Sequence, residues 1–248
     1  MKKEGKAWRR SAIAAVVLGG VLITAAISVL YIPSLGLVDL REVVISGNRR
    51  ASASEVVSLS SLSRGQSLFA ISLHRTASLI KKHPWVRDVR LTRDLPHAVH
   101  IAVEEREEIA WMSSPSDGGC ILLGDGGVVV SIECVSSPSL VELRGAVVTS
   151  HVPGGRLVDG RVTDLLQSLQ REDLHSLRVT SLNVSNLASI ELLAEDGLRL
   201  RLGDIEGVIG RVEALAALGR RIDFRDYELV DLRFGGEATL VPRKAVRR

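Results

Sequence analysis

A long apolar run near the start of the chain limits its fold more than any other feature. The stretch SAIAAVVLGGVLITAAISVLYI extends from Ser11 to Ile32 without a charged residue. As a helix, a run of this length rises about 33 Å, which matches the hydrocarbon core of a bilayer. The residues before it, MKKEGKAWRR, contain five basic side chains and one acidic side chain. We therefore expect a single transmembrane helix over 11–32, with residues 1–10 in the cytoplasm.

A cleaved signal peptide is the alternative interpretation of this run. Signal peptides have an apolar region of about 7–15 residues that ends in a small-residue cleavage site. The run is longer here, and the bulky residues Leu30, Tyr31 and Ile32 occupy its end. The sequence thus favours an uncleaved anchor, and both interpretations place the chain after Pro33 outside the cytoplasmic membrane.

The composition argues against a nucleic-acid partner. Hydrophobic residues make up 46% and charged residues 25% of the chain, the balance of a globular protein. Aromatic residues are only 3%, which supplies a base-stacking surface poorly. The net charge of +3 is small and lies mainly at the two ends, so we expect no nucleic-acid-binding face.

The segment 38–107 has the pattern of a small α+β domain. A strand at 43–46 ends at a Gly-Asn turn, and a capping box, Ser52 with Glu55, begins a helix. A second helix is expected from Ser72 and ends before Pro84. The stretch HPWVRDVRLTRDLPHAVHIAVEERE then alternates as two strands around Asp94-Leu95-Pro96. The expected order is strand, helix, helix, strand, strand.

The segment 109–242 is expected to be mostly antiparallel β with one or two helices. Hairpins are predicted around Asp125–Gly127, Asp196–Gly197 and Gly235–Gly236. Helices are predicted over Val162–Gln170 and Ile205–Leu218. The second helix should bury a face formed by Ile209, Val212, Leu215 and Ala216.

The acidic and histidine-containing parts of the chain do not predict a catalytic or metal site. Four carboxylates, Glu104, Glu105, Glu107 and Glu108, follow a strand whose successive side chains point to opposite faces. His97 and His100 also fall on opposite faces of that strand. We expect ordinary surface carboxylates, no metal and no cofactor.

The serine motifs are equally unspecific. Ser78 to Lys81 reads S-x-x-K and Ser181 to Asn183 reads S-x-N, but the K-T-G that penicillin-recognising enzymes also need is absent. We therefore expect no catalytic residues and a protein that is not an enzyme.

The two cysteines leave two alternatives open. Cys120 and Cys134 lie in a compartment that favours disulfides. A tight turn at Asp125–Gly127 would place Cys120 opposite residue 132, so a bridge requires a longer turn or a bulge. A disulfide and two buried free thiols both fit the sequence.

Taken in order behind a single span, several motifs resemble the bacterial cell-division family FtsQ, called DivIB in other lineages. They are VVISGN (43–48), GQSLF (65–69), PWV (84–86), the R-x-x-P of 93–96, VEER (103–106) and VDLRF (230–234). The sequence departs from the family pattern at Glu108, where a Pro is usual, and at Trp111, which follows Ala110 directly. These departures weaken any claim that this junction binds as it does in other members.

The resemblance implies an architecture and a role. It implies a POTRA domain at 38–107, an FtsQ-type β domain at 109–242 and a basic tail at 243–248. It also implies a non-enzymatic adaptor, concentrated at the division septum, that links an FtsB–FtsL coiled coil to septal cell-wall synthesis. The POTRA domain and the span would serve recruitment into the division complex.

The family resemblance also implies a docking site for the FtsB partner at the C-terminal sheet edge. Carried over to this sequence, the partner-binding residues are Phe234, Gly235, Gly236, Glu237, Ala238, Thr239, Leu240 and Val241. Pairing should end at Pro242, which cannot donate a backbone hydrogen bond. Phe234 is either an exposed aromatic anchor or an inward-facing core residue.

Two other function classes remain as alternatives. A chaperone-like POTRA module would handle polypeptides in the cell envelope and bind unfolded chains promiscuously. A cell-wall hydrolase or transpeptidase would turn over peptidoglycan and depend on Ser78. The adaptor interpretation instead requires discrete partners that are lost when the chain is truncated before Glu237.

Overall fold

A computed structural model describes residues 17–21, 23–24, 38–114, 119–133, 140–172, 174, 177–234 and 237–243. The predicted span at 11–32 therefore lies largely outside the described residues. Residues 17–21 and 23–24 are helical, and the Thr24 hydroxyl donates to the carbonyls of Gly20 and Val21. Within the described part of the chain, no helix combines the length and the apolar character needed to cross a membrane.

The chain divides into two compact units, one of residues 1–81 with 88–104 and one of 82–87 with 105–248. The first unit has the predicted strand, helix, helix, strand, strand order. Its elements are β1 (Glu42–Ser46), α2 (Ala53–Ser60), η2 (Leu68–Ala70), α3 (Leu73–Ile80), β2 (Val86–Asp94) and β3 (Ala98–Glu105).

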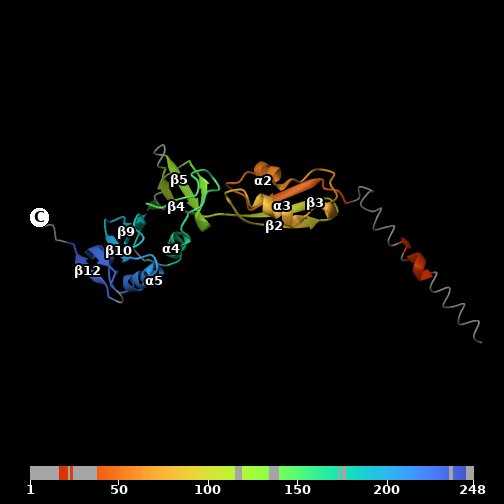
Figure 1. Ribbon diagram of the computed structural model, residues 1–248. Helices are drawn as coiled ribbons and strands as arrows, with labels where there is room; N and C mark the ends of the chain where they lie inside the picture. Colours follow the sequence, from red (N-terminus) through yellow and green to blue (C-terminus); the bar gives the residue numbers. More distant parts are fainter. Residues whose placement is uncertain are drawn as a thin grey trace, which may run out of the picture. The chain divides into compact units, whose positions relative to one another are not determined.

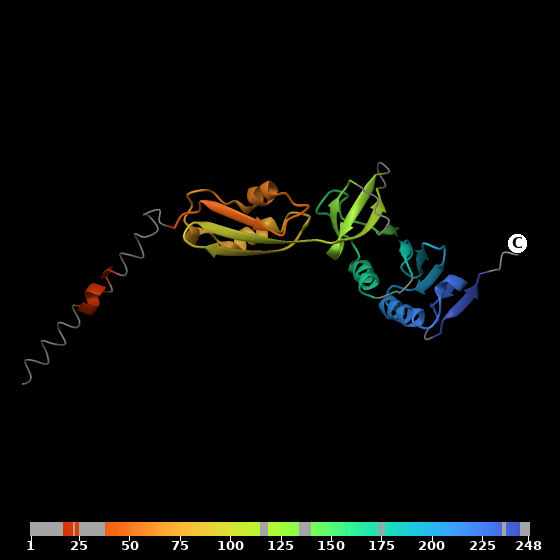
Figure 2. The same cartoon turned by 180° about the vertical axis from the view of Figure 1, so that it is seen from behind.

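The described strands of the first unit form a sheet in the order β1-β3-β2. β1 pairs with β3 in parallel, from Glu42 opposite Ala98 to Ser46 opposite Ala102. Figure 1 shows α2 and α3 in front of this sheet, and Figure 2, seen from behind, shows the strands in front of the helices. The two helices thus cover the same face.

Local sequence signals set the helix boundaries of this unit. The predicted capping box is present, because the Ser52 hydroxyl accepts from the Glu55 amide and the Glu55 carboxylate accepts from the Ser52 amide. Ser72 caps α3 through the Arg75 amide, also as predicted. Arg93, the arginine of R-x-x-P, donates from Nε to the Leu68 carbonyl at 2.8 Å and from Nη2 to the Ile71 carbonyl at 2.7 Å.

In the second unit, the described strands form one sheet in the order β12-β11-β10-β9-β8-β7-β4-β5-β6. Most neighbouring pairs are antiparallel, whereas β10–β11, β4–β7 and β7–β8 are parallel. The strands are β4 (Glu108–Ser113), β5 (Cys120–Gly124), β6 (Val128–Ser131), β7 (Val141–Arg144), β8 (Val179–Asn183), β9 (Ile190–Ala194), β10 (Arg199–Gly203), β11 (Tyr227–Asp231) and β12 (Thr239–Pro242).

Two helices contact each other and the sheet in the second unit, α4 (Gly160–Arg171) against β4 and α5 (Val208–Gly219) against β10 (Figure 1). Short 3₁₀ turns occur at η3 (Asp125–Gly127) and η4 (Phe224–Asp226). The core of this unit lies between helices and sheet and includes Leu165, Leu192, Leu200 and Leu215. This arrangement confirms a mixed α+β fold with a POTRA-like unit and a large sheet.

One predicted core residue is wrong. Ile209 was expected on the buried face of α5, but its side chain is 42% exposed. Val208 is buried in its place, together with Val212, Leu215 and Ala216. The helix begins at Val208 rather than at Ile205, and Val208, at i−4 from Val212, completes the buried stripe.

Arg106, the arginine of the VEER motif, lies in the second unit, two residues after the first unit ends at Glu104. Arg106 donates to the Pro84 carbonyl at 3.2 Å and to the Asp125 carbonyl at 2.8 Å. Its backbone amide donates to the Trp85 carbonyl at 2.8 Å. Burial lowers the pKa of the Arg106 guanidinium, and the nearby Asp125 carboxylate acts in the opposite direction.

Candidate partner-docking edge

β12 is the terminal strand of the large sheet and pairs on one side with β11. The register places Asp231 opposite Thr239, Val230 opposite Leu240 and Leu229 opposite Val241. Leu240 packs against the core, while Thr239 is exposed. Within the described part of the sheet, the outer side of β12 is an edge, and unpaired strand edges accept further strands.

The backbone hydrogen bonds show which groups of β12 face outward. The Arg243 amide donates to the Asp226 carbonyl at 2.9 Å, so residue 243 faces β11. Because successive amides along a strand point to opposite sides, Val241 and Thr239 also face β11. The amides and carbonyls of Ala238 and Leu240 therefore point to the outer edge.

The strand pairing of β12 with β11 ends at Pro242, as predicted, and one further backbone hydrogen bond follows it. Pro242 lies opposite Tyr227, and Arg243 continues the backbone bonds beyond it. The missing amide of Pro242 belongs to an outward-facing position, where a proline removes no hydrogen bond to β11.

The turn of the last hairpin is longer than predicted. β11 ends at Asp231 and β12 begins at Thr239, so the connection is longer than a two-glycine turn. The Glu237 amide donates to the Phe234 carbonyl at 3.1 Å across it. Two predicted partner-binding residues, Gly235 and Gly236, lie outside the described residues.

Phe234 lies on the surface, so its alternative assignment to the core is wrong. Its side chain is 63% exposed. The guanidinium carbon of Arg233 lies 5.4 Å from the ring centroid, within the range of a cation–π contact. An exposed, oriented aromatic ring next to a sheet edge has the properties of an interface anchor.

A buried aspartate fixes Arg233. Asp231 is 5% exposed and accepts from Arg233 Nε at 2.9 and 3.0 Å and from Nη2 at 2.7 Å. These hydrogen bonds, opposed by burial, hold the pKa of Asp231 below its usual value. The VDLRF motif is thus a local clamp in which Asp231 positions Arg233 and Arg233 packs on Phe234.

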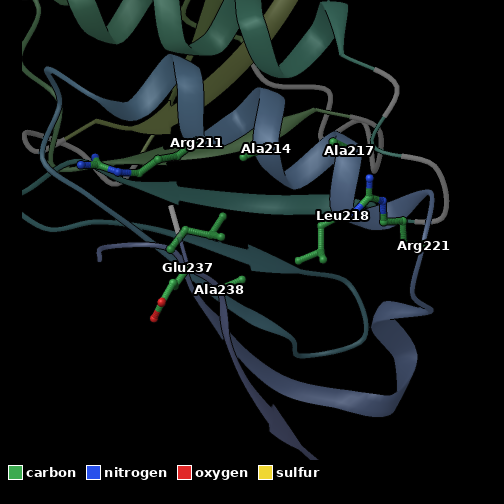
Figure 3. Close-up of a pocket in the computed structure, with 8 residues that line it drawn as sticks. Arg211, Ala214, Ala217, Leu218, Arg221, Glu237 and Ala238 are labelled. Carbon is green, nitrogen blue, oxygen red and sulfur yellow. The ribbon is translucent and has the colours of Figure 1, made fainter. Parts of the chain in front are cut away.

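A groove lies between α5 and the start of β12. Its volume is about 310 Å³, and Ala214, Ala217, Leu218 and Leu232 give it an apolar floor. Figure 3 shows Arg211 and Arg221 towards opposite ends of the helix segment, with Glu237 and Ala238 below it. Two of the predicted docking residues therefore line a groove that the sequence reasoning did not identify.

The spacing of residues along the α5 segment contains a sequence signal for this groove. Arg211, Ala214, Leu218 and Arg221 are spaced i, i+3, i+7 and i+10, which puts them on one face of a helix. Alanines on that face leave room for another element. The buried stripe of the same segment dominates its hydrophobic pattern and hides the exposed one.

The two groove arginines differ in their surroundings. Arg211 Nη2 contacts the Asp204 carboxylate at 3.2 Å, and Nη1 donates to the Asp204 carbonyl at 3.0 Å. These contacts, opposed by burial, lower the pKa of Asp204. Arg221 is exposed and follows the end of α5. Both cations border an apolar floor.

His97, His100 and Ser78, which were weighed as candidate catalytic or metal-binding residues, each contact a different partner. His97 Nδ1 lies 3.1 Å from the Asp39 carbonyl, whereas His100 Nε2 lies 3.1 Å from the Asp94 carboxylate. Ser78 donates to the His74 carbonyl, and Lys81 pairs with Asp88 at 2.5 Å. Over the residues that the structure describes, no group of three or more His, Cys, Asp or Glu could hold a metal.

Cys120 is in a disulfide bond. The other cysteine of the chain, Cys134, lies outside the described residues. The predicted turn at Asp125–Gly127 is present as η3, with β5 and β6 paired around it and a register shift near Leu122.

A comparison with known protein families matches residues 38–106 to the POTRA domain of the FtsQ type. The match begins at Val38, includes all the described strands and helices from β1 to β3, and ends at Arg106.

Comparisons with characterised proteins give relatives with consistent names. The cell division protein DivIB of Clostridium acetobutylicum is 20% identical over 158 residues, which are 62% of this chain and 63% of the relative. FtsQ of Myxococcus fulvus is 35% identical over 72 residues, 29% of this chain and 25% of the relative. FtsQ of Rickettsia felis is 27% identical over 120 residues, 48% of this chain and 43% of the relative.

The aligned segment thus spans less than two thirds of the length of each of these relatives. Within that span, the findings confirm the resemblance drawn from the sequence motifs. The chain is related to the FtsQ and DivIB proteins, and its residues 38–106 match the POTRA domain of the FtsQ type.

Proposed function

We propose that this relative of FtsQ and DivIB is a non-enzymatic adaptor in bacterial cell division. It is anchored in the cytoplasmic membrane by residues 11–32, keeps most of its chain on the outer side and concentrates at the septum. The POTRA match and the cell-division names of its relatives support this role. The proposed domains are 38–107 for the POTRA domain and 109–242 for the β domain, followed by the basic tail 243–248.

The proposed partners are division proteins of the FtsB and FtsL type, which the adaptor links to septal cell-wall synthesis. The observation that carries this proposal is the outer edge of β12. Ala238 and Leu240 present their backbone amides and carbonyls there, and an extended partner segment adds a strand by pairing with them. Phe234 lies beside this edge as an aromatic anchor.

The groove along α5 extends the proposed site. Its apolar floor suits one face of an amphipathic partner helix, and Arg211 and Arg221 suit acidic residues on that helix. A coiled-coil protein that ends in an extended segment has both parts. The partner strand then fixes the register of the partner on β12, and the partner helix buries apolar side chains in the groove.

The direct test is a pull-down from bacterial membranes with the full chain. We expect FtsB- and FtsL-type proteins to be captured by the full chain and lost from a chain that ends at Gly235. Ala238→Pro removes one outward amide from an exposed position and should reduce capture at least about tenfold. Ala238→Gly keeps the amide, adds no atoms to the groove and is the matched control. Absence of both partners from the full-chain sample would end the adaptor proposal.

A second pair of variants tests the groove. Ala217→Leu fills it and should weaken capture, while Ala188→Leu, at an exposed position outside it, should not. If both leave capture unchanged, the partner uses the strand edge alone. Promiscuous capture of unfolded envelope proteins would instead favour a chaperone-like POTRA module.

A further inference from the structure

Three segments meet where the chain enters the POTRA unit (Figure 1). The Leu68 amide donates to the Val38 carbonyl at 2.9 Å, and Asp39 forms a β-bridge with Ser67. His97 Nδ1 lies 3.1 Å from the Asp39 carbonyl. We call this end, formed by residues 38–41, 64–70 and 94–97, the entry end of the unit.

Two large apolar side chains are exposed at the entry end. Phe69 is 59% exposed in η2, and Leu95 is 56% exposed in the turn between β2 and β3. Arg93 holds the two segments together through its hydrogen bonds to the Leu68 and Ile71 carbonyls, which flank Phe69. Among the described residues of 38–104, no other large hydrophobic side chain is as exposed as these two.

The chain length places this end close to the apolar run. Only residues 33–37 separate Ile32, the end of the run, from Val38. A connection of this length spans at most about 20 Å even when it is fully extended. If residues 11–32 cross the membrane, the entry end therefore lies within reach of the lipid headgroups.

We propose that the entry end of the POTRA unit rests on the membrane surface, with Phe69 and Leu95 inserted at the lipid interface. This inference rests on the membrane anchor in the proposed function. Aromatic side chains favour the interfacial region, and buried apolar area drives such peripheral contacts. The anchor makes the contact intramolecular, so a weak affinity of the two side chains suffices to populate it.

The charges at the entry end argue for an apolar contact rather than an electrostatic one. Arg41 and Arg64 are exposed there, and Arg64 Nε donates to the Arg41 carbonyl at 3.2 Å. Within the entry end these positive charges are matched by Asp39 and Asp94, and the adjacent Glu42 and Arg93 offset each other. The contact should therefore depend little on anionic lipid.

The test places a fluorophore beside Phe69 without removing either apolar side chain. The full chain carrying Ala70→Cys is labelled and reconstituted into phosphatidylcholine vesicles that contain nitroxide-labelled lipid. The control label is at Ser46→Cys, which is exposed at the other end of β1, about 16 Å further along the strand. Unsubstituted protein, treated in parallel, reports any labelling of the native cysteines.

We expect the lipid nitroxide to quench the label at residue 70 several-fold more than the label at residue 46. Adding Phe69→Ser and Leu95→Ser should make the quenching at residue 70 equal to that at residue 46. Phe69→Leu should keep the quenching at residue 70 higher. Replacing part of the phosphatidylcholine with phosphatidylglycerol should leave the quenching unchanged, and a strong rise would contradict an apolar contact.

The outcomes separate this inference from the anchor on which it rests. Vesicle flotation reports whether the protein is in the membrane. If the protein floats with the vesicles but residues 70 and 46 are quenched equally, the interface contact is wrong and the anchor stands. If the protein does not float with the vesicles, the proposed anchor fails and the inference fails with it.

Discussion

Arginines in the sequence motifs act as clamps on backbone and side-chain oxygens. Arg93 holds two carbonyls of the segment that carries Phe69, and Arg106 holds the carbonyls of Pro84 and Asp125. Arg233 is held by Asp231 and in turn orients Phe234. A guanidinium has several donors in a fixed geometry, so one side chain can join segments that are distant in sequence.

The Asp231–Arg233 clamp predicts a pH-dependent stability. The pKa of Asp231 is lowered in the folded protein, so its stabilising contribution is present above the unfolded pKa of about 3.9 and is lost as the pH falls through the lower folded value. Asp231→Asn should lower the free energy of unfolding by about 1 kcal/mol at pH 7, a value reduced for the partly exposed Arg233.

Urea unfolding at pH 7 and at pH 2 to 3 measures this effect. The difference between variant and unsubstituted protein should shrink at the lower pH, where Asp231 is becoming protonated in both states. Glu213→Gln, on the exposed side of α5, is the control. A difference that is equal at both pH values would mean that the charge of Asp231 contributes nothing.

At the scale of single elements, a glycine in a turn is costly to replace because of its backbone conformation, and the tertiary environment can add to that cost. Gly47 and Gly65 both have a φ of +81°, which favours glycine. A Cβ at Gly47 would lie 2.2 Å from the Val103 carbonyl oxygen, whereas a Cβ at Gly65 would meet nothing within 4 Å. The two positions therefore form a matched pair for substitution.

Gly47→Ala should destabilise the POTRA unit by at least about 3 kcal/mol, because it adds a backbone clash between β1 and β3 to the conformational strain. Gly65→Ala carries the strain alone and should cost about 1 kcal/mol. Hydrogen exchange of the β3 amides in the full chain measures both. Equal protection in the two variants would show that the Val103 contact relaxes without cost.

At the scale of the whole molecule, the chain has two compact units, so recruitment to the septum and docking of partners can be tested separately. The family resemblance implies that the POTRA domain and the span serve recruitment, and the proposed function assigns partner docking to the β12 edge. A fluorescently tagged chain that ends at Gly235 should therefore still concentrate at the septum, while it no longer captures the FtsB- and FtsL-type partners.

Fluorescence microscopy of dividing cells, with the tagged full chain as the control, checks this prediction. A truncated chain that folds and reaches the membrane but spreads uniformly would contradict the division of labour. Recruitment would then depend on the docking edge as well.

The sequence by itself determined the elements whose signals are local. The capping box at Ser52 and Glu55, the Ser72 cap, and the hairpins at Asp125–Gly127 and Asp196–Gly197 all depend on residues within a few positions of one another. The ordered motifs also indicated the relationship to the FtsQ and DivIB proteins that the comparisons support. Each of these features follows from short-range hydrogen bonds or from backbone preferences.

The tertiary structure decided what depends on distant partners. The parallel pairings β4–β7, β7–β8 and β10–β11 join strands that no hairpin connects directly. The outward direction of Ala238 and Leu240, the surface position of Phe234 and the groove along α5 follow from the register with β11 and from helix packing. A local pattern gives a strand its two faces, but only its neighbours determine which edge remains open.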